Sequence, residues 1–162
     1  MIMRPALRKL VLTLHIVSSV GMLGAVVGFL ALALVGLVAG EAANATGIYF
    51  AMGRLTWLAI LPLAFATLLI GLLESLGTKW GLFRHYWVVA KLALTLLAVV
   101  VLLLQLDTID LLSTATGLQN LWAARLSLVL HSAGGLVVLL LAVVLSVYKP
   151  RGRLPRRVAP AG

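Results

Sequence analysis

The chain has 162 residues, of which 63% are hydrophobic and only 10% are charged, and it contains no cysteine. This composition excludes an ordinary soluble domain, and the lack of cysteine excludes disulfides, thiolate metal sites and thiol redox chemistry. Thirteen lysines and arginines against four acids give a formal charge of +9, so the distribution of these cations must be explained.

Four long apolar runs account for the composition. They cover residues 10–39, 55–73, 86–106 and 121–148. Each run has about the 20 residues that a helix needs to cross a bilayer, and none shows the two-residue alternation of a barrel strand. The sequence therefore predicts an all-α fold, a single four-helix transmembrane bundle over residues 1–148, followed by a basic tail over residues 149–162.

The first run contains a histidine, His15, within the stretch KLVLTLHIVSS. His15 lies six residues past Lys9, which places it about 9 Å inside the bilayer at about 1.5 Å per residue. An ionisable residue at such a depth marks a pathway, a ligand site or an interhelical hydrogen bond. His15 is therefore the first candidate site residue.

The second run is flanked by two charged residues, Arg54 before it and Glu74 at its end. Both are candidate polar residues of the membrane region. Pro62 lies inside the run and has no amide hydrogen, so we expect a kink near residues 58–61.

The connection to the third run combines aromatic and basic side chains, the mixture that is typical of a headgroup interface. His85 ends this connection, and Lys91 follows six residues later, again about 9 Å deep. Lys91 and His15 are thus expected at matching depth, close enough to Glu74 to form a cluster. The alternative is that Lys91 only extends its ammonium to the headgroups.

The third connection contains Asp107 and Asp110, which we expect in an exposed turn as helix-end or solvated groups rather than as metal ligands. In the fourth run, RLSLVLHSAGG repeats the cation-to-histidine spacing with Arg125 and His131. This run crosses in the opposite direction, so His131 is expected about 12 Å from the level of His15. A true repeat of the two stretches would be inverted, as in several transporters.

The cations are distributed unequally between alternate connections, which predicts the orientation of the chain. Arg54 and Arg125 lie on one side of the predicted bundle, and the other eleven lie on the opposite side. These eleven are Arg4, Arg8, Lys9, Lys79, Arg84, Lys91, Lys149, Arg151, Arg153, Arg156 and Arg157. By the positive-inside rule both termini are cytoplasmic, and the chain is a multi-pass protein of the cell (inner) membrane.

The tail KPRGRLPRRVAPAG has no aromatic residue among its cations. We therefore expect it to bind anionic lipid headgroups rather than nucleic acid. A membrane-protein partner or a second copy of the chain is a further expected contact.

Two stretches resemble a known group of small bacterial membrane proteins. LRKLVLTLHIVSSVGMLGA resembles the first helix, and HYWVVAKLALTLL the lysine-bearing helix, of the CopD-like assemblage, which includes HemJ-type oxidases and predicted integral membrane families of unknown function. The resemblance implies that His15 and Lys91 take part in binding haem b, with His85 nearby. The aromatic, basic and histidine cluster that follows the first helix in those oxidases is absent from GFLALALVGLVAG.

These observations leave three functions open. The first is a non-enzymatic or redox-accessory protein that binds b-type haem through His15; if the chain is an enzyme, it is a haem-dependent membrane oxidoreductase. The second is a carrier of a metal, a proton or a small solute that uses His15 and His131. For copper, a site rich in methionine and histidine is expected, and only Met22 and Met52 are available, so copper is a weaker candidate than haem. The third is a partner subunit whose histidines only hydrogen-bond neighbouring helices.

Overall fold

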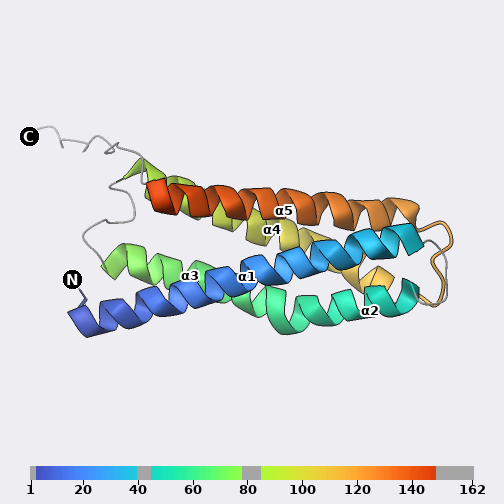
Figure 1. Cartoon of the computed structure of the whole chain (residues 1–162), viewed down its shortest axis with the longest axis horizontal. Coiled ribbons are helices and arrows are strands. Elements are labelled where there is room, and N and C mark those ends of the chain that lie inside the picture. Colours follow the sequence, from blue (N-terminus) through green and yellow to red (C-terminus); the bar gives the residue numbers. More distant parts are fainter. Residues whose placement is uncertain (1–2, 40–44, 78–84, 149–162) are drawn as a thin grey trace, which may run out of the picture.

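The computed structural model describes residues 3–39, 45–77 and 85–148 (Figure 1). Its elements are α1 (Pro5–Ala39), α2 (Ala45–Leu55), a π-helical turn η1 (Thr56–Ile60), α3 (Leu61–Gly77), α4 (Tyr86–Thr114) and α5 (Trp122–Tyr148). Because α2, η1 and α3 form one span, the described residues contain four helices that are long and apolar enough to cross a membrane. The predicted all-helical, four-helix architecture is confirmed.

The four spans form an up-and-down bundle. The first span packs against the second and against α5, while α4 packs against α5 and against the second span. The start of α1, the end of α3, the start of α4 and the end of α5 gather at one end, which we call the termini end; the other end is the opposite end (Figure 1). Neighbouring spans are thus antiparallel, as short connections require.

The outer surface of the bundle is strongly apolar. Val38 is 87% exposed, Leu58 77% and Leu104 72%. A surface of this kind would cause association in water, whereas in a bilayer it faces the lipid. Length, composition and surface therefore all support a multi-pass membrane protein.

The two largest extensions beyond the predicted bounds are those of α2 and α4. α2 begins at Ala45 rather than near residue 55, because Arg54 lies on the helix surface with its guanidinium 4.9 Å from the centroid of the Phe50 ring and so does not interrupt the helix. α4 continues to Thr114 and includes Asp107 and Asp110, which corrects the expectation that these acids lie in a turn.

Asp110 stabilises the extension of α4. Its carboxylate accepts a hydrogen bond from Trp57 Nε1 at 3.1 Å, and its main-chain oxygen accepts hydrogen bonds from the hydroxyls of Ser113 and Thr114 at 3.1 and 2.7 Å. The first bond joins η1 to α4, and the other two satisfy a carbonyl in the last turn of the helix.

The predicted irregularity near Pro62 takes the form of the π-helical turn. Leu61 donates its main-chain N–H to Thr56 O, five residues back, and Pro62 follows with no N–H to give. Thr56 is buried, and its hydroxyl donates to Met52 O at 2.9 Å. This side-chain bond satisfies a carbonyl at the irregularity, as a bilayer-spanning segment requires.

Arg125 joins three helices near the opposite end. It is only 4% exposed, and its Nη2 donates to Gly36 O and Leu37 O at 2.9 Å each, while its Nε donates to the Tyr49 hydroxyl at 3.1 Å. The carbonyls belong to the last turn of α1, which has no intrahelical donors for them. Gly36 permits the Tyr49 ring to lie close to α1, because a Cβ on Gly36 would lie 2.9 Å from that ring. Arg125 therefore caps α1 and fixes α2 and α5 against it.

We expect Arg125→Leu to lower the free energy of unfolding by about 3 kcal/mol, because it leaves two buried carbonyls and a buried phenol without their donor. Thermal unfolding of the purified protein in detergent measures the change. Arg54→Leu is the matched control, since Arg54 is exposed, and it should shift the melting temperature little. Equal shifts in the two variants would contradict the capping role of Arg125.

Candidate functional site: an ionisable cavity at the termini end

A cavity of about 290 Å³ lies among all four spans in the half of the bundle nearer the termini end. Its polar lining comprises His15, Ser19, Thr67, Glu74, Ser75, Trp87, Lys91, Thr95 and Ser146. The remaining lining residues are mainly aliphatic. The structure thus brings His15, Glu74 and Lys91 around one internal space, which we call the ionisable cavity.

The change in direction at η1 creates this space. Toward the opposite end, α2 packs closely against α4, whereas beyond Pro62 α3 lies chiefly along α1 and contacts α4 much less. Figure 1 shows α1 and α3 together on one side of the termini end and α4 with α5 on the other. The cavity occupies the region between these two pairs.

The imidazole of His15 packs against α3. A Cβ on Gly71 would lie 2.9 Å from His15 Cε1, so the ring occupies the space that the glycine leaves. Ser18 donates to the main-chain oxygen of His15 at 3.1 Å and not to the ring. His15 Nδ1 is buried and has no hydrogen-bond partner within the described residues. Nδ1 thus makes no interhelical hydrogen bond, whereas the backbone of Thr67 on α3 lies near enough to hydrogen-bond the ring. The expectation that His15 hydrogen-bonds a neighbouring helix stays a prediction.

Thr67 presents a second buried polar atom without a partner. The residue is 6% exposed and lines the ionisable cavity, and its Oγ1 has no hydrogen-bond partner in the described part of the chain. Threonine in a helix usually donates to the carbonyl three or four residues back, as Thr13 and Thr56 do here. A buried hydroxyl that lacks such a bond requires another partner, such as a ligand or an ordered water.

Two opposite charges complete the lining. Lys91 Nζ donates to Ser146 Oγ on α5 and lies 5.8 Å from the centroid of the Trp87 ring. Both Glu74 and Lys91 are near enough to act electrostatically on His15, with opposite signs. Because the lysine is bonded across to α5, its ammonium is held inside the bundle.

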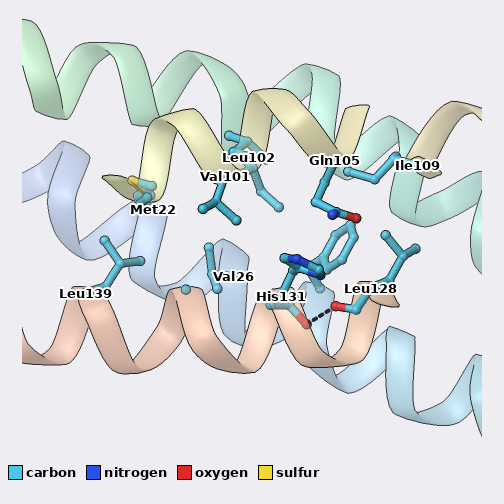
Figure 2. A pocket seen from close by; sticks show the side chains of 14 residues that line it. Met22, Val26, Val101, Leu102, Gln105, Ile109, Leu128, His131 and Leu139 are labelled. Carbon is cyan, nitrogen blue, oxygen red and sulfur yellow. Dashed lines mark hydrogen bonds between the residues drawn. The ribbon is translucent and has the colours of Figure 1, made fainter. Parts of the chain in front are cut away.

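The remaining candidates lie elsewhere. His85 precedes the first turn of α4 with its ring 6.3 Å from that of Trp87, and it does not line the ionisable cavity. Arg54 stacks on Phe50 at the surface, and Arg125 caps α1. His131 lines a second cavity of about 70 Å³ with Gln105, shown in Figure 2. Met22 and Leu139 line both cavities and so mark where the two adjoin.

The two histidines thus lie in different cavities, as their predicted depths required. In the described residues, no group of three histidine, cysteine or acidic side chains is placed to bind a metal ion. Thr67, Gly71, Trp87 and Ser146 belong to the site but were not singled out from sequence. The available sequence signals for the first two were a hydroxyl and a small residue within an apolar run.

Comparison with known proteins adds no relative. No protein-family model matches the sequence, and no curated protein or solved structure matches it.

The donor set of the ionisable cavity fits a haem iron poorly. His15 is its one imidazole among the described residues, and a histidine that binds a metal normally donates its second ring nitrogen to a carbonyl or carboxylate. His15 Nδ1 lacks such an acceptor. The ammonium of Lys91 is hydrogen-bonded to Ser146, and a lysine binds a metal only after it loses its proton.

We expect Gly71→Ala to displace the His15 ring, because the new methyl group would overlap it at 2.9 Å. Overpacking of this kind costs about 1 to 3 kcal/mol, which exceeds the gain of up to about 1 kcal/mol from replacing a helical glycine by alanine. The measurements are the melting temperature and the NMR shifts of the His15 ring.

Gly24→Ala is the matched control in α1, because a Cβ built on Gly24 would meet no atom of another helix within 4 Å. It should raise the melting temperature slightly and leave the ring shifts unchanged. Identical behaviour of the two alanine variants would show that the His15 ring does not occupy the space beside Gly71.

Proposed function

We propose that this chain is an integral membrane carrier that binds a small zwitterionic solute in the ionisable cavity. The observation that carries the proposal is the convergence of two buried polar atoms without partners, His15 Nδ1 and Thr67 Oγ1, on residues that line the same space as Glu74 and Lys91. Such atoms are costly in a bilayer unless a bound molecule satisfies them.

The charges of the lining favour a zwitterion over an ion. Glu74 and Lys91 carry opposite charges, so the cavity with both ionised is close to neutral. A solute of net charge would add an uncompensated charge within the bilayer, which is expensive. A solute with one ammonium and one carboxylate keeps the balance, and its two groups match Glu74 and Lys91 respectively. The volume of about 290 Å³ is at the small end of ligand pockets.

The distribution of cations supports an orientation in the cell membrane with the termini end in the cytoplasm. Arg4, Arg8 and Lys9 lie at that end of α1, as the positive-inside rule predicts for a cytoplasmic face. The ionisable cavity would then lie in the cytoplasmic half of the bilayer. A solute moving toward the opposite end must pass Met22 and Leu139, whose side chains are 2% and 9% exposed.

The test is binding and uptake of radiolabelled glycine and β-alanine, first by detergent-solubilised protein and then by proteoliposomes. We expect binding by the wild type and uptake faster than in empty liposomes. Glu74→Gln and Lys91→Gln should each reduce binding at least about tenfold, since each removes a hydrogen bond to a charged group. Acetate and methylammonium, which carry one charge each, should bind weakly.

Thr67→Val separates a ligand-binding hydroxyl from a structural one. Because Thr67 Oγ1 has no protein partner among the described residues, its loss should not lower the melting temperature, yet it should weaken binding of glycine several-fold. Arg54→Gln, which alters a charge outside the cavity, is the control for all these variants. Equal binding of glycine and acetate, or no binding of either zwitterion, would refute the proposal.

An absorbance spectrum of protein purified from haem-replete cells tests the haem hypothesis directly. The carrier proposal expects no Soret band. A Soret band that disappears in His15→Ala but persists in His131→Ala would instead support binding of haem at His15.

A further inference from the structure

Two residues that line the second cavity, Gln105 and His131, belong to a hydrogen-bond network with Ser127, and the geometry of this network determines its proton positions. His131 Nδ1 lies 2.8 Å from the main-chain oxygen of Ser127 and 3.2 Å from its Oγ. A carbonyl oxygen only accepts, so the hydrogen of the neutral imidazole is on Nδ1. His131 Nε2 therefore carries a lone pair and acts as an acceptor.

Gln105, on α4, supplies the complementary group. The Ser127 hydroxyl donates to Gln105 Oε1 at 3.2 Å, so the Ser127 oxygen remains free to accept from His131 Nδ1. The amide oxygen of Gln105 thus faces Ser127, and its NH2 group remains a donor. Figure 2 shows Gln105 and His131 pointing into the cavity from α4 and α5. Gln105 and His131 thus offer the cavity a donor and an acceptor, while the third polar residue of the lining, Ser132, donates its hydroxyl to Leu128 O at 2.6 Å.

The rest of the lining is almost entirely apolar. It includes Met22, Val26, Phe29, Leu102 and Leu139. His131 is itself exposed at the surface of the bundle, so the cavity is open there toward the side that faces lipid. A ligand that enters by this route must be lipid-soluble and must carry a polar group small enough to meet both residues.

We infer that this cavity binds the hydroxyl group of a lipid-soluble phenol or alcohol. A hydroxyl satisfies both residues through one oxygen, since it donates to His131 Nε2 and accepts from the Gln105 amide. The volume of about 70 Å³ accommodates the hydroxyl end of such a molecule, and the remainder lies toward the bilayer. The inference is independent of the proposed carrier function, because it rests on other residues in another cavity.

The probe is 2-naphthol, a lipid-soluble phenol, and its matched control is 2-methoxynaphthalene, which keeps the ring system but cannot donate a hydrogen bond. Binding is measured by fluorescence to the protein in nanodiscs, after subtraction of partitioning into empty nanodiscs. We expect the wild type to bind 2-naphthol about tenfold more tightly than its methyl ether. This comparison requires no variant and so does not depend on the folding of one.

The variants identify the residues. His131→Phe and Gln105→Leu should each weaken binding of 2-naphthol about tenfold and leave binding of the methyl ether unchanged. Leu130→Phe, at an exposed position that does not line the cavity, should change neither. In ¹⁵N NMR spectra, addition of 2-naphthol should shift the acceptor nitrogen of His131.

Three results would overturn the inference. The first is equal affinity of 2-naphthol and its methyl ether for the wild type. The second is no binding of 2-naphthol above partitioning into empty nanodiscs, which would mean that the cavity holds only water or lipid chains. The third is a ¹⁵N spectrum that places the His131 hydrogen on Nε2.

Discussion

The interior of this bundle depends on a change in direction within its second span. A regular helix over Ala45–Gly77 would run in one direction throughout. The π-helical turn at Thr56–Ile60 and the missing N–H of Pro62 instead allow α2 to pack on α4 while α3 leans toward α1. The ionisable cavity occupies the space thus opened, and the Thr56 hydroxyl satisfies the Met52 carbonyl beside the turn. One local irregularity therefore accounts for the larger of the two cavities described above.

Burial of apolar surface does not explain why the four spans associate, because the lipid is as apolar as their side chains. Close approach and hydrogen bonds between spans must supply the energy. Tyr49 packs against Gly36, and His15 packs against Gly71, while Arg125 bonds α1 to α2 and α5, and Trp57 bonds η1 to α4. These contacts lie at different levels of the bundle, so each fixes a different part of it.

The sequence predicts the spans and the separation of the two histidines because hydropathy and depth are properties of single helices. It also predicts an irregularity before Pro62, since the missing N–H is a local fact. It cannot predict the role of Arg125, because the carbonyls that Arg125 binds lie on another helix, about 90 residues away. The two unsatisfied atoms are likewise a result of packing: Thr67 resembles Thr56 in sequence, and only the structure shows that Thr56 bonds its own helix and Thr67 does not.

This difference between satisfied and unsatisfied polar groups separates structural residues from candidate functional ones. Arg125 is the most expensive side chain in the bundle to bury, yet two carbonyls and a phenol accept from it, so its role is explained by the fold alone. His15 and Thr67 are cheaper to bury, but His15 Nδ1 and Thr67 Oγ1 have no hydrogen-bond partner within the described residues. Folding by itself gives no reason to keep such atoms inside a bilayer, where an apolar residue of equal size would be favourable. The solute that we propose would give that reason, and the charges of Glu74 and Lys91 favour a zwitterion.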